Sequence, residues 1–390
     1  MSHFMRHHAT GHWIRVEVQD LLIAEVESAD GPEAISDSDA WLAPAFWDLQ
    51  LNGRWGVSFS DPELTVEHVA AIVRAQAELG TARLCPTLIS ATFECLRRGV
   101  ATIAAASDQY ADVGRRVLGI HLEGPYLSEL PGYRGAHPAE ALHDADWAEF
   151  ERLQEAAGGR IVLITLAPER PGAIEFIRKA TANGIIVALG HTAADGRTIR
   201  EAAQAGARLS THLGNGIAAQ LARHPNPIWN QAADDRLWAT LIADGHHLDE
   251  ATLRVLVRAK TPERIILVSD ASPLAGLPPG RYGEWAVDPA GKIVVAGTPY
   301  LAGSNQALET GVNFLIRSTA LSLSKAVETV TCNAARLLGR PEPKLEPGQS
   351  ANFVRFRLRD VEGSTAIELV STCVDGEWTP CSPALEAPWK

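Results

Sequence analysis

The sequence predicts an α/β fold, namely a (β/α)8 TIM barrel with a small β-sandwich domain that both ends of the chain build together. Eight short, β-rich apolar runs recur between residues 46 and 271, and they end at polar residues or glycine. Segments with helical apolar spacing lie between them, and strands that alternate with helices pair in parallel. Eight such units predict a closed barrel. An open doubly wound sheet is the alternative, but no GxGxxG follows a first strand.

The eight barrel strands are expected in the middle of the chain, in the runs FWDLQL, ARLCPTLIS, RRVLGIHLEG, RIVLITLAPE, GIIVALGHT, ARLSTHLGN, LWATLIADGHH and RIILVSDAS. Helices are expected between them, in segments such as LTVEHVAAIVRAQAELG, FECLRRGVATIAAAS, GAIEFIRKATANG and DGRTIREAAQAG. The late segment SKAVETVTCNAARLLG predicts a helix pair or one broken helix that ends at Gly339.

The two ends of the chain show a different pattern. HWIRVEVQDLLIAEVES, ANFVRFRLRD and AIELVSTCVDGEW alternate apolar and polar residues, which is typical of half-buried antiparallel strands. We therefore expect residues 1–44 and 345–390 to form the small β-sandwich and residues 45–344 to form the barrel.

Composition and charge restrict the classes of partner. The 390 residues carry a formal net charge of -12, and 46% of them are hydrophobic, as in soluble globular proteins. An acidic surface repels nucleic acid and anionic membranes, so an anionic substrate needs a local cationic pocket. The five cysteines form no CxxC pair, and no apolar run approaches the roughly 18 residues of a membrane span. These features favour a cytoplasmic protein with reduced thiols.

The first strand raises the question of a metal. Asp48, Gln50 and Asn52 stand at alternate positions of FWDLQLNG, in a place where many metal-dependent hydrolases carry a His-x-His pair. Neutral amides bind divalent metals poorly, so the chain either has no metal or binds it elsewhere.

Polar residues at the carboxyl ends of later strands offer such a place, because chemistry in these barrels belongs at that end. They are Glu123, His191, His212, His247 and Asp270. A carboxylate and two imidazoles match a catalytic zinc site with an open position for water, which places the metal on Glu123, His191 and His212. Each residue alone has a structural alternative: a loop carboxylate, a hydrogen-bonded histidine, or an Asx residue that caps a turn. His121 lies two residues before Glu123 on the same strand, and we expect it to be a core histidine or a residue that supports the metal ligands.

Nine motifs follow one another along most of the chain, from about Pro44 to Ala351: HLEGPYL, RGAHP, ITLAPE, VALGHTAAD, STHLGN, ADGHH, VSDAS, LAGS and NAARLLG. This ordered series resembles the N-acetylglucosamine-6-phosphate deacetylases of the amidohydrolase superfamily. The resemblance implies the same barrel with a terminal sandwich, and a Gln-x-Asn first strand is similar to the single-metal branch. It also implies a homodimer and one divalent ion per chain, zinc first, with iron, cobalt or manganese as alternatives.

The resemblance implies roles in the reaction for five residues. Glu123, His191 and His212 hold the metal. Asp270 takes a proton from water and delivers it to the departing nitrogen, while His137 helps to polarise the amide carbonyl. The expected reaction is hydrolysis of the N-acetyl amide of N-acetylglucosamine 6-phosphate to glucosamine 6-phosphate and acetate.

The resemblance also implies a set of substrate contacts. The Ala136 backbone lies beside the amide carbonyl with His137, and the backbone of Leu301, Ala302 and Gly303 lines the acetyl end. Asn215 and Gly216 contact the phosphate, and His247 binds sugar hydroxyls or the same anion. Arg223 reaches the phosphate from a neighbouring subunit.

Two departures from the family pattern lie near the expected phosphate. Gly214 stands where the family usually has a tyrosine, and Arg223 is followed by His-Pro-Asn in place of Glu-Pro-Gly. His224 and Trp229 either reshape the pocket or pack a loop. Three functions therefore remain open: the deacetylase above, an amidohydrolase of a different, unphosphorylated N-acyl compound, and a noncatalytic binding protein that retains the scaffold.

Overall fold

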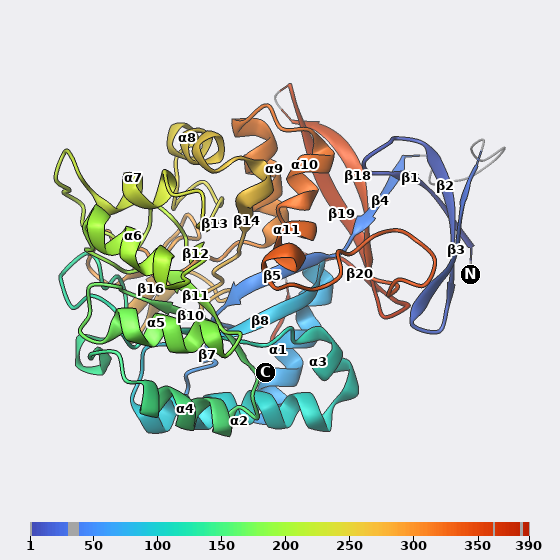
Figure 1. Cartoon of the computed structure of the whole chain (residues 1–390). Coiled ribbons are helices and arrows are strands. Elements are labelled where there is room, and N and C mark those ends of the chain that lie inside the picture. The colour runs from blue at the N-terminus through green and yellow to red at the C-terminus, as the bar shows by residue number, and fades with distance from the viewer. Residues whose placement is uncertain (1, 30–38, 362, 383–384, 390) are drawn as a thin grey trace.

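Figure 1 shows the computed structural model of the chain, which describes residues 2–29, 39–361, 363–382 and 385–389. Parts of the expected small domain, residues 30–38 among them, lie outside the described residues. No helix within those described segments is long and apolar enough to cross a membrane.

The central sheet is an eight-stranded parallel barrel whose strands follow one another in sequence order. The first strand meets the last at the carboxyl end, where Leu51 pairs with Ala271 and the Asp270 N–H donates to the Gln50 carbonyl at 3.0 Å. All eight predicted runs supply one strand each, so the predicted fold class is confirmed. The strands are β5 (Phe46–Leu51), β8 (Thr81–Ile89), β9 (Ile120–Glu123), β10 (Ile161–Leu166), β11 (Ile186–Leu189), β12 (Leu209–Ser210), β13 (Trp238–Leu241) and β14 (Ile265–Leu267).

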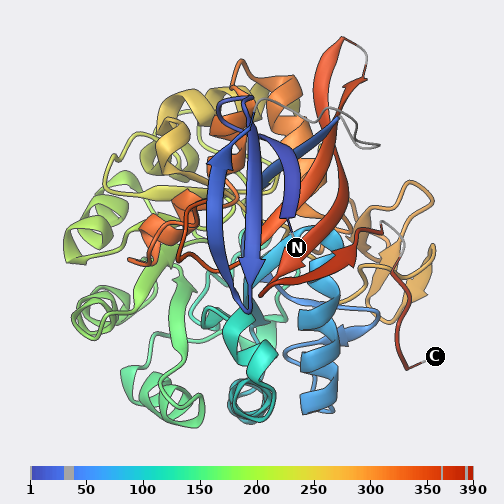
Figure 2. The same cartoon turned by 90° about the vertical axis from the view of Figure 1, so that its right-hand side faces the viewer.

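Helices surround this barrel, and Figure 2 shows them as a ring behind the terminal strands. Several begin at a side chain that accepts a backbone N–H, for example Thr65, Asp195 and Asp249, which fixes where each helix starts. The late segment forms a helix pair. The helices are α1 (Val66–Ala75), α2 (Phe93–Gln109), α3 (Ala111–Arg116), α4 (Trp147–Ala156), α5 (Ala173–Ala182), α6 (Gly196–Ala205), α7 (Pro227–Ala232), α8 (Glu250–Lys260), α9 (Leu308–Ser318), α10 (Leu323–Glu328) and α11 (Cys332–Leu337), with short 3-10 turns η1 (Gln76–Leu79), η2 (Ala139–Ala141) and η3 (Pro262–Arg264).

Both ends of the chain meet in one seven-stranded sheet, in the order β20-β19-β18-β4-β1-β2-β3. The strands are β1 (Ser2–His7), β2 (Trp13–Gln19), β3 (Leu22–Ser28), β4 (Ala40–Pro44), β18 (Phe353–Val361), β19 (Ser364–Val374) and β20 (Glu377–Pro380). Val354 and Phe356 pack toward Phe46 and the α9 side of the barrel, while Val16 and Leu42 belong to a separate small core. The arrows of β5 and β8 point away from this sheet, so it lies near the amino ends of the barrel strands (Figure 1).

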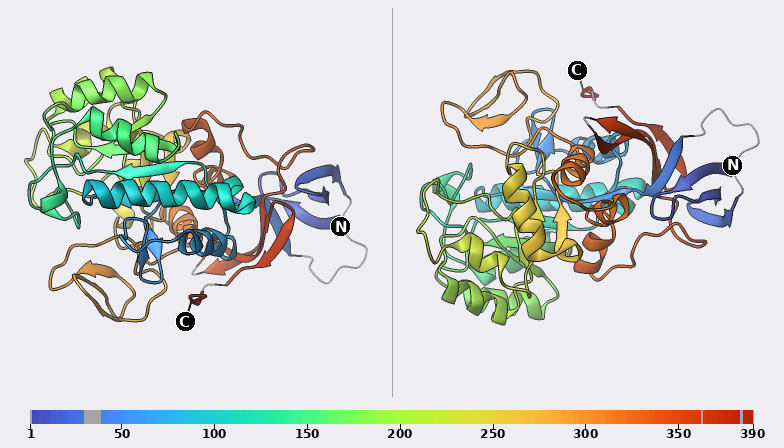
Figure 3. Two further views of the ribbon diagram at one scale, coloured as in Figure 1. Left: turned by 90° about the horizontal axis from the view of Figure 1, so that it is seen from below. Right: turned by 90° about the horizontal axis from the view of Figure 1, so that it is seen from above.

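Two small strand groups extend from the barrel and were not expected from the sequence. β6 (Gly53–Arg54) and β7 (Val57–Ser58) form a hairpin after β5. β15 (Gly280–Tyr282), β16 (Trp285–Val287) and β17 (Ile293–Val295) form an antiparallel sheet after β14, which stands out from the barrel in Figure 3. Leu274, Val287, Ile293 and Ala302 make a core of its own under that sheet.

Candidate metal centre and active site

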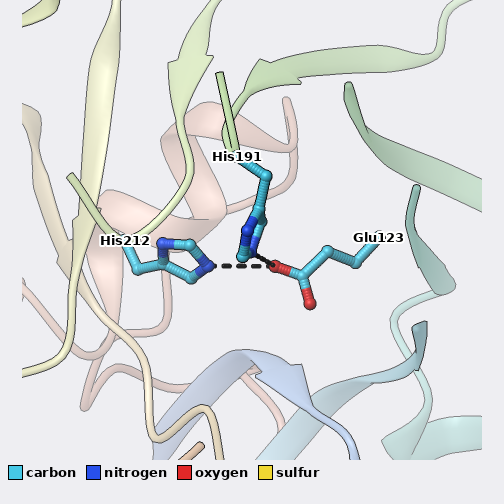
Figure 4. Close-up of side chains that lie close together, drawn as sticks. All are labelled: Glu123, His191 and His212. Carbon is cyan, nitrogen blue, oxygen red and sulfur yellow. Dashed lines mark hydrogen bonds and ion pairs between the residues drawn. The ribbon is translucent and has the colours of Figure 1, made fainter. Parts of the chain in front are cut away.

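Glu123, His191 and His212 converge at the carboxyl ends of β9, β11 and β12 (Figure 4). The Glu123 Oε1 atom lies 3.0 Å from Nε2 of His212 and 3.4 Å from Nε2 of His191. One ligand atom from each of the three buried residues lies within 4.8 Å of the others. The donors are one carboxylate and two imidazoles on three separate strands, a set that fits a divalent ion with an open position.

Hydrogen bonds and burial set the protonation of these three groups. The Nδ1 atom of His191 lies 2.8 Å from the Tyr133 carbonyl, which can only accept, so Nδ1 carries the proton and Nε2 is free to be a ligand. Burial opposes ionisation of Glu123, yet its close contacts with His191 and His212 hold the pKa of its carboxyl well below the usual value. Burial likewise disfavours charge on His212, but its contact with Glu123 raises the pKa of that imidazole.

The backbone at this end of the barrel is strained. His191, His212 and Asp270 have φ values of 48°, 29° and 47°, in the left-handed region that residues with a Cβ rarely adopt. Such conformations cost about 1–3 kcal/mol each and persist only where surrounding contacts enforce them. Three of them at three strand ends mark this rim as a functional region.

Asp270 lies beside the cluster and is held by the amides of the first strand. Gln50 Nε2 donates to Asp270 Oδ1 and to Glu123 Oε1, each at 3.0 Å, and Asn52 Nδ2 donates to Asp270 Oδ1 at 2.6 Å. Burial and the negative charge of Glu123 raise the pKa of Asp270 to about 6. Gln50 and Asn52 therefore act here as hydrogen-bond donors to two carboxylates, and their side-chain amide oxygens are buried with no hydrogen-bond partner among the described residues.

His137 faces the same cluster from the loop after β9. Its Nδ1 atom accepts the backbone N–H of Ser90 at 3.3 Å and lies 2.9 Å from the Ser90 hydroxyl. Burial lowers the pKa of His137 to about 3, so the ring is neutral and its proton is on Nε2. That Nε2 atom lies 3.9 Å from Glu123 Oε2, so His137 presents a donor toward the metal cluster. No sequence motif indicated Ser90, because its contact with His137 depends on how two loops distant in the sequence pack together.

A cavity of about 510 Å³ opens over these groups. Of the expected substrate contacts, Ala136, His137, Asn215, Gly216, His247, Leu301, Ala302 and Gly303 all line it. The Nδ2 donor of Asn215 is buried and finds no partner in the described part of the chain, so it is available to a ligand. His247 is oriented by Asp244, whose Oδ2 atom also accepts the Ser304 hydroxyl. Trp285, from the inserted sheet, and Tyr300 also line the cavity, and no strand-end pattern in the sequence could have identified them.

The part of the loop around Arg223, unlike the expected substrate contacts above, lies outside the cavity lining of its own chain. Arg223 is exposed and does not line the cavity of its own chain, and Trp229 is 48% exposed. Within the described segments the cavity lining holds no lysine and no arginine. The described lining of one chain therefore offers amide, imidazole, indole, hydroxyl and backbone donors to a phosphate, but no ammonium or guanidinium group.

His121 lies one layer below the metal cluster, inside the barrel. Its Nε2 atom is 2.8 Å from the Thr165 hydroxyl and its Nδ1 atom is 3.4 Å from the Thr87 hydroxyl. Burial lowers its pKa to about 4, so it is a neutral, hydrogen-bonded histidine of the barrel interior.

Comparisons with known proteins agree with this site. The amidohydrolase family model matches residues 41–379. The N-acetylglucosamine-6-phosphate deacetylase of Bos taurus is 38% identical over 327 residues, which cover 80% of this chain and 78% of that protein. The N-acetylgalactosamine-6-phosphate deacetylase of Escherichia coli O157:H7 is 32% identical, with coverage of 87% and 89%.

Solved structures show the same relationship. The crystal structure of N-acetyl-D-glucosamine-6-phosphate deacetylase from Mycobacterium smegmatis superimposes with a TM-score of 0.81 at 32% identity, and covers 94% of this chain and 95% of that one. A mutant of the same enzyme in complex with N-acetyl-D-glucosamine-6-phosphate also gives a TM-score of 0.81 at 32% identity, with coverage of 94% of both chains.

Proposed function

We infer the function from the family: the chain belongs to the amidohydrolase family and, within it, to the N-acetylglucosamine-6-phosphate deacetylases. We propose that it hydrolyses the N-acetyl amide of N-acetylglucosamine 6-phosphate to glucosamine 6-phosphate and acetate. The observation that carries the proposal is the buried convergence of Glu123, His191 and His212 beside Asp270 at the base of one large cavity.

The proposed site binds one divalent metal ion per chain through Glu123, His191 and His212. Zinc is the expected ion, and iron, cobalt and manganese are the alternatives. When bound, the ion supplies Lewis acidity, which polarises an amide carbonyl and makes a nearby water acidic enough to attack at neutral pH. Single occupancy is supported by Gln50 and Asn52, because their amide nitrogens point at Glu123 and Asp270 where imidazole ligands of a second ion would be needed.

Asp270 and His137 carry the proposed proton transfers and charge stabilisation. Asp270 takes the proton of the attacking water and passes it to the amine nitrogen as the C–N bond breaks. A pKa of about 6 suits both steps at neutral pH, because the carboxylate is a stronger base than an exposed one and still mostly ionised. His137 donates its Nε2 proton to the oxygen that becomes negative at the acyl carbon.

The remaining contacts would bind the sugar. Asn215, the Gly216 backbone and His247 are proposed to reach the phosphate or the sugar hydroxyls, with Leu301 to Gly303 at the acetyl end. The missing cation is proposed to be Arg223 of a second copy, which makes the working unit a homodimer. A cytoplasmic location is also proposed, and the five free cysteines support it.

An acetate-release assay over N-acetylglucosamine and N-acetylgalactosamine, each with and without the 6-phosphate, tests the function. We expect the highest kcat/KM with N-acetylglucosamine 6-phosphate. Both epimers are included because relatives are named as deacetylases of either sugar phosphate.

One observation favours an alternative substrate, an unphosphorylated N-acyl compound: the cavity lining contributed by the described residues has no lysine or arginine. A preference for the unphosphorylated sugars would select that alternative.

A further inference from the structure

A buried carboxylate outside the catalytic set lies directly behind Asp270. Asp48 is in the middle of β5, is only 2% exposed, and points at the strand end that carries Asp270. Its Oδ1 atom accepts the backbone N–H groups of Gln50 and Ser269, each at 3.2 Å, and its Oδ2 atom accepts the Ser269 hydroxyl at 2.5 Å. Across the described segments no lysine, arginine or histidine contacts this carboxylate, so these hydrogen bonds are its sole compensation.

The contacts of Asp48 continue to both sides of Asp270. The Ser269 hydroxyl that donates to Asp48 also accepts the backbone N–H of Ala271 at 3.1 Å. Ser269 is thus hydrogen-bonded directly to Asp48 of β5, and Ala271 is linked to Asp48 through the Ser269 hydroxyl. Asp270, which lies between them, has a φ of 47°. The Asp270 peptide itself is bonded on both sides, because its N–H donates to Gln50 and its carbonyl accepts the Ser304 N–H at 2.8 Å.

The burial of the Asp48 carboxylate costs free energy. Burial raises the pKa of Asp48 to about 6, and the nearby charge of Asp270 acts in the same direction. A barrel that needed only packing at this position would be served by an apolar residue, which has no desolvation penalty. The cost is understandable if the hydrogen bonds enforce a backbone conformation that Asp270 would otherwise leave.

We propose that Asp48 and Ser269 are positioning residues, which hold the Asp270 carboxylate in the orientation that its proton transfers require. This inference rests on the proposed hydrolysis. Asp48 is not among the described residues that line the cavity, and its hydrogen bonds go to Gln50 and Ser269. It acts through Ser269 and Ala271 on the strained turn that aims Asp270 at the cavity.

The test compares Asp48→Ala, Ser269→Ala and the double variant with the wild type, each loaded with metal. Because a small misplacement of a reacting group can cost about 100-fold in rate, we expect kcat of Asp48→Ala to fall about 10- to 100-fold. KM should change less than threefold and metal content should stay at the wild-type level. The double variant should lose no more than the worse single variant, since both changes break the same contact. Asp48→Asn, which keeps one acceptor oxygen, should recover part of kcat.

Asp375→Asn is the matched control. Asp375 is also a buried aspartate, 6% exposed, but it pairs with Arg83 and Arg115 at the opposite end of the barrel. Its loss should lower stability and leave kcat unchanged. If Asp48→Ala behaves like this control, with kcat within twofold of wild type in folded, metal-loaded enzyme, the proposal is wrong. Loss of metal in proportion to loss of kcat would also overturn it.

A crystal structure of metal-loaded Asp48→Ala separates this proposal from the proposed function. We expect the Asp270 backbone to leave the left-handed region or its carboxylate to turn away from Asn52. An unchanged Asp270 would refute the positioning role even if the enzyme is a deacetylase. Conversely, a displaced Asp270 together with a wild type that releases no acetate would support the positioning role of Asp48 and reject the deacetylase activity.

Discussion

At the scale of single residues, Asp270 combines the properties of a proton-transfer group. It is buried, it accepts hydrogen bonds from Gln50 and Asn52, and its pKa is raised to about 6. We expect Asp270→Asn to keep the metal and the fold, because the amide preserves size and shape. An amide cannot cycle a proton, so kcat should fall about 100- to 10,000-fold, which acetate release at saturating substrate would measure. Turnover close to wild type would assign the base to another residue.

The proposed metal ligands are the subject of a second prediction at this scale. The purified protein should contain about one divalent ion per chain, and His191→Ala or His212→Ala should lose it, because two ligands do not hold a divalent ion in competition with water. Metal analysis by mass spectrometry, normalised to protein concentration, gives the ratio. His121→Ala serves as the control, since that ring contacts threonines below the cluster. Two tightly bound ions per chain, with Gln50 or Asn52 as ligands, would contradict the prediction.

At the scale of secondary-structure elements, the barrel was predictable and its extensions were not. The strands are apolar on a regular repeat, and the polar residue after each strand is fixed by the topology, which is why Glu123, His191 and His212 could be picked before the geometry was known. The hairpin β6–β7 and the sheet β15–β17 have no such repeat. Trp285 and Tyr300 therefore enter the cavity from segments whose sequence resembles ordinary loops. The left-handed turns at the three strand ends depend on contacts from other strands, which a single sequence does not display.

The turn between β19 and β20 couples the terminal sheet to the barrel. Asp375 in this turn bonds to Arg83 of β8 at 3.2 Å and to Arg115 of α3 at 2.8 Å. Burial opposes its ionisation, but the hydrogen bond from Arg115 and the charge of Arg83 hold the pKa of Asp375 below its usual value. We propose that residues 1–44 and 345–390 form the small domain, and this ion pair ties that domain to the barrel.

Asp375→Asn should lower the free energy of unfolding by about 1.5–3 kcal/mol at pH 7, the range for hydrogen bonds to a charged group. A carboxyl whose pKa is lower in the folded state stabilises the fold above its unfolded pKa of about 3.9, and that contribution disappears as pH falls through the folded value. The difference between wild type and variant in urea unfolding should therefore be constant from pH 7 to about 5 and shrink at lower pH. A difference that grows on acidification would contradict the assignment.

At the scale of the whole molecule, the cavity of one chain has no lysine or arginine among the described residues that line it. The protein has a net charge of -12, so binding of a phosphate requires positive charge close to the phosphate. A guanidinium is suited to a bidentate contact with it. In the single chain Arg223 is exposed and is not among the described residues that line the cavity. The family resemblance predicts that it serves a neighbouring subunit, and we propose on that basis that activity requires a dimer.

Arg223→Ala should weaken binding of the phosphorylated sugar by about 1.5–3 kcal/mol, which raises KM roughly 10- to 150-fold. The KM of an unphosphorylated analogue should hardly change.

An experiment with mixed variants tests whether the arginine acts between subunits. Arg223→Ala has an intact metal site but no arginine, and His191→Ala has the arginine but a broken metal site. A mixed dimer of the two regains one complete site, because the intact metal site receives Arg223 from its partner. Unfolding and refolding the two variants together should therefore restore activity at low substrate concentration above the sum of the separate variants. If the arginine served its own chain, the mixed dimer would hold no complete site, and the absence of any gain would remove Arg223 from the shared site.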